Sequence, residues 1–339
     1  MNNLCENIKI ETFNFGVKHA DNIEKYEFKE QWPVVYIIHG KKEAYIGETV
    51  NLSRRIEQHL ENNERCKLTK INVIGDKRFN KSVVLALESY LIKYMSGDGK
   101  FKLQNKSVGL SHHNYYQMEK YKFNKIWEKL NELGLVEHTI KAIENSDLFK
   151  YSPYKELTDE QLKVSKDILK QLVECDLNNE KCSIIINGEP GTGKTILAIY
   201  LMKMLATIKD YEDIEDEGNE AMQNSQLKQI ENMKFGFVVP MKSLRKTLKK
   251  VFKSIQGLNS NMVISPIQCL KEKYDILIVD ESHRLRRRLN LSGGGDYTAF
   301  DKNNAQIGLG DDGTELDWIW GLAFNLKPNN NALTCIVYP

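Results

Sequence analysis

The sequence predicts an α/β protein built from two modules, and two patterns predict this class. In the first third of the chain, short β-rich runs around a glycine turn precede helices with an apolar stripe, which indicates a small mixed α/β module with a short central sheet. In the second half, apolar strands alternate with helices, which is typical of a parallel sheet covered by helices. The length of 339 residues exceeds what one hydrophobic core usually organises, so two domains are expected.

Composition indicates a globular protein outside the membrane. Hydrophobic residues make up 41% of the chain and charged residues 28%, and no apolar run approaches the roughly 20 residues that a membrane span requires. The N-terminal segment MNNLCENIKIETFNF lacks the features of a secretory signal, so a cytoplasmic location is expected. The six cysteines are interpreted as free thiols because they form no C-x-x-C pair. Neither a structural zinc nor a disulfide framework is expected.

Charge is distributed unevenly around a net value of +2. Basic residues gather in RRIEQH, MKSLRKTLKKVFKS and HRLRRRL, and acidic residues gather in KDYEDIEDEGNE. Each run fits a solvated helix face or loop as well as it fits a surface that contacts phosphates, so charge alone leaves both readings open.

Local patterns place the elements of the first module. Residues 1–30 are expected to be an N-terminal extension and residues 31–115 the module itself. WPVVYIIHGKKEAYIGET predicts a hairpin around Gly40, Asn51 is expected to cap the helix NLSRRIEQHLENN, INVIG predicts a strand, and KSVVLALESYLIKYM predicts a helix. Residues 116–154 are expected to form a helical linker in which Gly134 ends a helix.

The second module is expected over residues 155–339. LTDEQLKVSKDILKQL predicts a helix capped by Thr158 or Asp159. CSIIING predicts a buried strand, ILAIYLMKMLATI the helix that follows it, and FGFVVP and YDILIVDE two further strands.

An ordered set of polar residues in the first module resembles the GIY-YIG nucleases. The runs VVY, YIG and NLSRR are followed by a glutamate in a helix and an asparagine in a later loop, over roughly the first third of the chain. Singly, each residue fits ordinary packing or a solvated surface. The resemblance implies a metal-dependent nuclease with these site residues: Tyr36, Tyr45, Gly47 closing the motif, Arg55, His59, Glu88 and Asn105. This chain has VVY where the family has GIY. Because the third residue of the tripeptide carries the chemistry, we expect the difference to affect the rate of cleavage and not the class of enzyme.

Hydrolysis of a phosphodiester requires the same residue types. It needs a deprotonated water, a cation for the charge on the phosphoryl oxygens, and stabilisation of the leaving oxygen. Tyr36 is a candidate general base or water-orienting group, although a tyrosine titrates near pH ~10 and needs help from a cation to act as a base. Arg55 supplies a positive fork for phosphate, and Glu88 would hold Mg²⁺ or Mn²⁺. His59 follows Arg55 by four positions, on the same helical face, where it can shuttle protons or contact phosphate.

GEPGTGKT at residues 188–195 is a full phosphate-binding loop pattern between a predicted strand and a predicted helix. Its glycines let backbone N–H groups and a helix N-terminus surround phosphates. The pattern predicts an ATP site with Mg²⁺. Its expected residues are Gly188, Gly191, Gly193, Lys194 for the β- and γ-phosphates, Thr195 and Asp280 for Mg²⁺, and Glu281 to polarise the attacking water.

Residues 155–339 resemble the first, RecA-like motor lobe of superfamily 1 helicases, and are closest to the Schlafen-type DNA/RNA helicase-like ATPase domain. LTDEQ, VVPMKSLRKTL, DESHRL and TELDWIWGLAFN carry the resemblance. It implies that Gln161 contacts adenine and that Ser243 and Lys246 meet a nucleic-acid backbone. The sequence ends at CIVYP, within what resembles the strand before the family's third motif, so this stretch is expected to lack the second lobe and its arginines. Either the chain is a fragment, or a second copy or another chain supplies that lobe.

The function expected from the sequence is a metal-dependent endonuclease that hydrolyses DNA in preference to RNA and is coupled to an ATP-binding helicase-like module. The pairing suggests bacterial antiphage defence. The alternatives are a nucleotide-sensing protein that binds nucleic acid without cleaving it, and a nuclease-helicase of DNA repair or recombination. The sequence leaves open the cut-site preference, the oligomeric state, and whether ATP activates or restrains cleavage.

Overall fold

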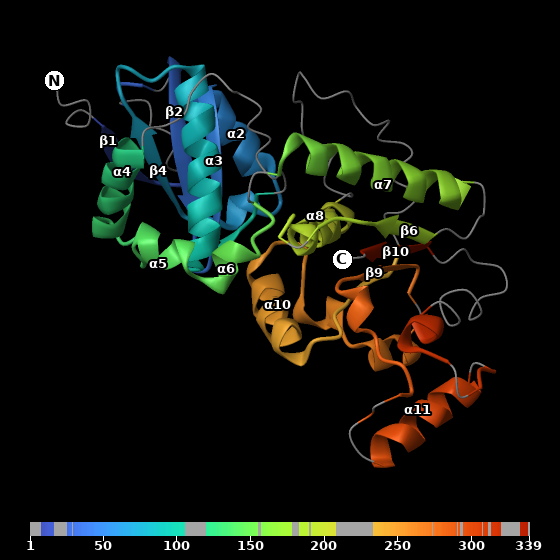
Figure 1. The fold of residues 1–339 in the computed structure, drawn as a ribbon. Helices are drawn as coiled ribbons and strands as arrows, with labels where there is room; N and C mark the ends of the chain where they lie inside the picture. Colours follow the sequence, from blue (N-terminus) through green and yellow to red (C-terminus); the bar gives the residue numbers. More distant parts are fainter. Residues whose placement is uncertain are drawn as a thin grey trace. The chain divides into compact units, whose positions relative to one another are not determined.

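A computed structural model of the chain describes residues 8–16, 26–28, 30–105, 120–154, 157–177, 183–189, 191–207, 233–272, 274–289, 291, 294–306, 308–310, 313–319 and 333–337. The chain divides into two compact units, residues 1–156 with 254–256, and residues 157–253 with 257–339 (Figure 1). The acidic run at residues 209–220, Cys5 and Cys182 lie outside the described residues. Among the described cysteines, Cys66, Cys175 and Cys269 are free thiols.

The first unit is a mixed α/β fold around a five-stranded sheet of order β1-β4-β2-β3-β5. All neighbouring strands are antiparallel except β3 and β5, which are parallel. Its elements are β1 (Lys9–Asn14), β2 (Glu30–His39), β3 (Glu43–Asn51), α2 (Leu52–Glu61), a 3₁₀ helix (Arg65–Lys67), β4 (Lys70–Gly75), α3 (Lys81–Asp98), β5 (Lys102–Leu103), α4 (Lys120–Glu132), α5 (Ile140–Glu144) and α6 (Asp147–Lys150). The segment expected to be an N-terminal extension therefore supplies an edge strand, β1, which pairs with β4 along its whole length.

Strand β2 is buried on both faces because its side chains alternate between two apolar clusters. Tyr36 and Ile38 pack with Leu52 of α2, whereas Val35 and Ile37 pack with residues of α3. Asparagine caps fix where the two helices begin. The Asn51 side chain accepts a hydrogen bond from the N–H of Arg54, as expected for a cap of α2, and Asn80 does the same for α3.

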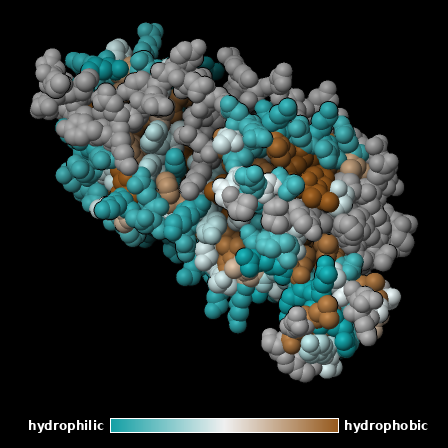
Figure 2. Space-filling model, viewed as in Figure 1, coloured by the Kyte–Doolittle hydropathy of each residue, from teal (hydrophilic) through white to brown (hydrophobic). Residues whose placement is uncertain are grey.

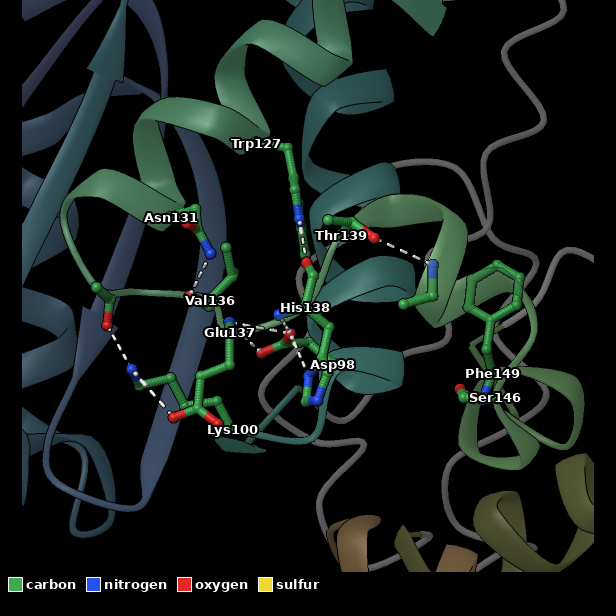
Figure 3. Close-up of polar contacts among 12 residues, drawn as sticks. Asp98, Lys100, Trp127, Asn131, Val136, Glu137, His138, Thr139, Ser146 and Phe149 are labelled. Atoms are coloured by element: carbon green, nitrogen blue, oxygen red, sulfur yellow. Dashed lines mark hydrogen bonds and ion pairs between the residues drawn. The ribbon is translucent and has the colours of Figure 1, made fainter.

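Helices α4 to α6 belong to the core of the first unit, although we expected this segment to be a linker. Phe123, Trp127 and Leu130 of α4 are buried in the same cluster as the apolar side of α3. The carboxylate of Asp98, at the end of α3, accepts hydrogen bonds from the backbone N–H groups of Glu137 (3.0 Å) and His138 (2.7 Å) and lies 3.1 Å from Nδ1 of His138 (Figure 3). These bonds tie the loop after α4 to α3.

The second unit contains a five-stranded parallel sheet of order β6-β10-β9-β7-β8. Its elements are α7 (Asp159–Leu177), β6 (Ser183–Ile186), α8 (Lys194–Thr207), β7 (Phe235–Val238), α10 (Lys242–Ser254), 3₁₀ helices Ser260–Met262, Pro266–Leu270 and Ser282–Arg284, β8 (Val263–Ile264), β9 (Ile276–Val279), α11 (Gly294–Gln306) and β10 (Leu333–Val337). The predicted α/β class is confirmed, with strand and helix alternating as the sequence pattern indicated. Strand β10 lies between β6 and β9 and pairs with both.

The surface shown in Figure 2 is mostly hydrophilic over the described residues, with small hydrophobic patches. Within the described part of the chain, the large apolar side chains that are exposed are Val50, Leu133, Ile185, Ile267 and Leu289. None of the described helices is long and apolar enough to cross a membrane.

Candidate active site and phosphate loop

The pairing of β2 with β3 places the two tyrosines on one face of the first sheet. Tyr36 pairs with Gly47 and Ile38 with Tyr45, so both tyrosine side chains point toward α2. Their ring centres are 6.3 Å apart. Glycine is required at position 47 because a Cβ atom there would overlap the hydroxyl of Tyr36 and lie 2.6 Å from its Cζ. The close approach of the strand to the ring explains why the motif closes with glycine.

Helix α2 adds an arginine and a histidine to the tyrosine pair. The Tyr36 hydroxyl oxygen lies 2.7 Å from Nε2 of His59, and Nε of Arg55 donates a hydrogen bond to it at 3.3 Å. Arg55 and His59 are one helical turn apart, which lets both reach the same oxygen. The His59 ring centre is 4.8 Å from that of Tyr45. Tyr36, Tyr45, Arg55 and His59 therefore form one cluster.

Burial sets the charge states in this cluster. The pKa of His59 is lowered to about 2 by burial and by the nearby positive charges of Arg65 and Arg55, so its imidazole is neutral at physiological pH. Burial raises the pKa of Tyr36 well above 10, the charges of Tyr45 and Glu88 add to this, and Arg55 opposes it. For Arg55, burial works against the charged form, but the two tyrosines outweigh it and raise its pKa. Metal-free, the site holds a phenol, a neutral imidazole and a guanidinium.

Glu88 of α3 acts on this cluster through its charge. It is half-buried, and its carboxylate is close enough to raise the pKa of Tyr36. In the described part of the chain, no group of three or more His, Cys, Asp or Glu residues is arranged to hold a metal ion. A single carboxylate fits a hard cation such as Mg²⁺, which usually keeps several of its waters, and does not fit a closed zinc site.

Asn105 binds the backbone of β3. Its Oδ1 accepts a hydrogen bond from the N–H of Ile46 at 3.1 Å, and its Nδ2 donates one to the Ile46 carbonyl at 2.7 Å. Only 4% of Asn105 is exposed. These bonds hold the strand between Tyr45 and Gly47 in place, so the side chain we expected in the catalytic set contacts main chain instead.

Two residues of the site were missed in the sequence. Nη1 of Arg65 lies 3.0 Å from Nδ1 of His59, and its Cζ lies 4.0 Å from the ring centre of Tyr45. Gln58 accepts a hydrogen bond from Nη1 of Arg55 at 2.9 Å. Gln58 could have been found from its place three positions after Arg55 on a predicted helix. Arg65 carried no such signal, because it follows the end of that helix.

Residues 188–195, the segment expected to be a phosphate loop, connect β6 to α8 in the second unit. Gly191 and Gly193 have φ angles of +83° and +82°, which favour glycine. The ammonium group of Lys194 donates hydrogen bonds to the carbonyls of Gly188 (2.6 Å) and Glu189 (2.8 Å), so it lies across its own loop. Gln161 donates a hydrogen bond to the carbonyl of Thr192 at 2.7 Å. The side chain that we expected to contact adenine thus touches the loop itself.

Two acidic residues follow β9. Thr195 donates a hydrogen bond to Oδ2 of Asp280 at 2.8 Å, and burial raises the pKa of Asp280. Glu281 has a left-handed φ of 54°, which is uncommon for a residue other than glycine. Its carboxylate accepts a hydrogen bond from Nε of Arg284 at 2.9 Å and lies 3.5 Å from Nε2 of His283. Thr195 and Asp280 are therefore in contact, and the Glu281 carboxylate is paired with residues of its own turn.

Helix α10 presents a basic face in the second unit. Its apolar residues Leu248, Val251 and Phe252 are buried, whereas Ser243 and Lys246 are exposed. An amphipathic helix with exposed lysines offers positive charge to phosphates, and that helix carries the two positions expected near a nucleic-acid backbone.

Comparison with protein families gives two matches. Residues 33–125 match the model of the GIY-YIG catalytic domain. Residues 181–308 match the model described as Schlafen group 3, DNA/RNA helicase domain. Searches of curated proteins and of solved structures give no match. Both resemblances expected from the sequence are confirmed at the level of the domain.

Proposed function

We propose that this chain, which joins a GIY-YIG catalytic domain to a Schlafen group 3 helicase domain, is a metal-dependent endonuclease whose cutting of DNA is governed by nucleotide bound at its second unit. The first domain is that of a nuclease, and the second is helicase-like, so both point to nucleic acid as the partner. Beyond these two domains, we infer the catalytic residues, the metal, the preference for DNA and the role of ATP.

The observation that carries the proposal is the environment of the Tyr36 oxygen. It lies within hydrogen-bond distance of nitrogen atoms from His59 and Arg55. Tyr36 is fully buried, and buried hydroxyls in ordinary packing seldom collect two nitrogen partners and a neighbouring carboxylate. Perturbed groups gathered at one point favour catalysis over simple packing.

Three residues of the cluster are assigned tasks in phosphodiester hydrolysis. A water oxygen bonds to phosphorus, the bond from phosphorus to the leaving oxygen breaks, one water proton is taken up, and the leaving oxygen receives a proton. Once ionised, with its own proton lost to solvent, Tyr36 orients the attacking water and accepts its proton, Arg55 binds the phosphate, and solvent protonates the leaving oxygen. Tyr45 packs beside both and helps to keep Arg55 charged. Asn105 positions β3 and does not take part in the chemistry.

Glu88 would hold the divalent cation, Mg²⁺ or Mn²⁺. When bound, such a cation supplies positive charge to the phosphoryl oxygens in the transition state. The negative charge of Glu88 is one of the causes that keep the pKa of Tyr36 high. Neutralising that charge favours the phenolate, which gives this protein a physical reason to require a metal.

In the second unit, we assign ATP to the phosphate loop. Lys194 would leave the carbonyls of its own loop to bind the β- and γ-phosphates, while Thr195 and Asp280 would hold Mg²⁺. Gly188, Gly191 and Gly193 shape the loop, Gln161 supports it, and Glu281 must leave Arg284 before it can polarise a water. Because Glu281 is paired in this way, we expect slow turnover of ATP by the chain alone.

The test is cleavage of supercoiled plasmid in the presence of Mg²⁺, with single-stranded DNA and RNA as further substrates. Glu88→Gln and Tyr36→Phe should each lower the rate by roughly 100-fold or more, the range for loss of a general acid or base. Glu57→Gln changes an exposed glutamate of α2 in the same way and should leave the rate unchanged. If Glu88→Gln cuts as fast as the parent, the assignment is wrong.

A nucleotide-sensing protein that binds without cutting is the second candidate. The pairing of Glu281 with Arg284 favours it, because an engaged glutamate suits a nucleotide switch better than a fast ATPase. Measuring ATP binding, ATP turnover and nicking on one preparation separates the two. Tight ATP binding without nicking under any metal supports the second candidate, and nicking that ATP modulates supports the first.

For the biological role, we propose defence against phage, with DNA repair or recombination as the alternative. A nuclease joined to a nucleotide-binding domain can be held inactive until an infection changes the nucleotide that this domain binds. Expression of the parent should lower phage plating, and Glu88→Gln should not. Protection against DNA-damaging agents with no effect on phage would favour repair.

A further inference from the structure

Arg65 lies directly after α2 and bridges two residues of the nuclease cluster. Its Nη1 is 3.0 Å from Nδ1 of His59, and its guanidinium carbon is 4.0 Å from the ring centre of Tyr45. This distance is that of a cation stacked on an aromatic face. Neither contact reaches the Tyr36 oxygen, so Arg65 acts on the site through its neighbours.

The turn that carries Arg65 is built to hold it. Oδ1 of Asn62 accepts hydrogen bonds from the N–H groups of Glu64 and Arg65, both at 3.1 Å. The Arg65 carbonyl then accepts one from the N–H of Leu68 at 3.0 Å, and the Leu68 side chain is buried in the cluster that contains both tyrosines. The backbone of Arg65 is therefore fixed on both sides.

The contact with His59 determines which imidazole nitrogen carries the proton. A guanidinium group is always protonated in proteins and only donates hydrogen bonds, so Nδ1 of His59 must accept. His59 is completely buried between two arginines and is neutral, so it has one N–H group, and that group is at Nε2. Nε2 lies 2.7 Å from the Tyr36 oxygen, to which it therefore donates.

We propose that Arg65 is a positioning residue that locks His59 as the Nε2–H tautomer, so that His59 and Arg55 both donate hydrogen bonds to the Tyr36 oxygen. This inference rests on the nuclease function proposed above. Its consequence is that His59 cannot accept the proton of Tyr36, since the nitrogen that faces the hydroxyl already carries one. Two N–H donors instead stabilise the phenolate, and the remaining lone pair of that oxygen is left for the attacking water.

The tautomer can be measured directly on metal-free protein by NMR with ¹⁵N-labelled histidine. The parent should show the Nε2–H form at His59. Arg65→Met keeps an apolar stem against Tyr45 but removes the donor, and His59 should then populate the Nδ1–H form, with cleavage lowered roughly 10- to 100-fold, as when the partner that orients a functional histidine is lost. Arg65→Lys restores a donor and should recover the Nε2–H form and most of the rate.

Arg54→Met is the matched control, because Arg54 is an exposed arginine of α2 and its loss should change neither the tautomer nor the rate. An Nδ1–H signal at His59 in the parent overturns the proposal, as does an Arg65→Met protein with unchanged tautomer and rate. The tautomer is read without metal or substrate. A parent with the Nε2–H form and no cleavage would therefore reject the nuclease function and leave the role of Arg65 in the hydrogen-bond network intact.

Discussion

His59 is a histidine that the fold keeps neutral, and this gives the protein an acid-sensitive stability. Its pKa is lowered from 6.5 to about 2 by burial and by Arg65 and Arg55. Between these values the unfolded chain binds a proton that the folded chain excludes, so the stabilisation is complete above pH 6.5 and is lost as the pH falls toward 2. From pH 6.5 to 5.0 the loss should be roughly 1.5–2 kcal/mol, since one proton contributes at most ~1.4 kcal/mol per pH unit and the unfolded histidine is half protonated at pH 6.5.

Urea denaturation of the parent and of His59→Gln at the two pH values measures this effect. The glutamine variant cannot take up the proton in its unfolded state, so its unfolding free energy should fall less than that of the parent. Equal losses in the two proteins would show that His59 does not cause the acid sensitivity.

Individual residues of the site differ in how far the sequence could predict them. Tyr36, Tyr45, Arg55 and His59 lie on a hairpin and the helix that follows it, so local spacing is enough to expect them together. Arg65 reaches His59 only because the chain turns back after α2, and a turn of that kind has no periodic signal. The sequence also could not reveal that Asn105 contacts main chain, since this depends on the pairing of β3 with β5.

At the scale of the hairpin, Gly47 controls how closely β3 approaches Tyr36. Gly47→Ala would force the buried ring aside, which should cost about 1–3 kcal/mol as overpacking usually does, and cleavage should fall because the Tyr36 oxygen moves. Gly40→Ala is the control in the same hairpin, since its Cβ would lie at an ordinary 3.5 Å from Cδ2 of Leu68. Melting temperature and plasmid nicking should separate the two variants, and similar behaviour would contradict this account.

Asn105 provides a second prediction for β3. Asn105→Ala leaves the N–H and carbonyl of Ile46 without their partner, and each buried unsatisfied group costs about 1–3 kcal/mol. The amide of Ile46 should then exchange with solvent faster than in the parent, which hydrogen exchange measures at that position. Unchanged protection at Ile46 combined with lost cleavage would restore the catalytic role first expected for this residue.

Helices and strands could be predicted from the sequence where the local residue pattern determines them. The hairpin, α2, α3 and the alternation in the second unit followed from periodicity and from caps such as Asn51. β1 was missed because six residues of moderate polarity become a strand only by pairing with β4. The segment of α4 to α6 resembled a linker because it is rich in Lys and Glu, yet its apolar residues meet α3 only in three dimensions.

At the scale of the whole chain, the two sets of residues belong to different units, so they should be separable by mutation. Without nucleotide, Lys194→Ala should cleave plasmid like the parent, while its ATP binding should fall by at least about 10-fold through loss of a charge-assisted contact. Glu88→Gln should bind ATP like the parent and cleave plasmid slowly. Nicking and ATP titration on both variants are the measurements, and slow nicking by Lys194→Ala without nucleotide would contradict the separation.

The position of β10 also orders events during synthesis of the protein. In the second sheet, Ser183 beside the phosphate loop pairs with Thr334, and Ile276 of the strand before Asp280 pairs with Leu333. Strands that meet across so long a stretch of sequence pair late, because the loop between them must first be closed. On the ribosome the first unit can complete its sheet long before residues 333–337 emerge. A nascent chain would therefore hold a finished GIY-YIG domain while the sheet of the second unit is still incomplete.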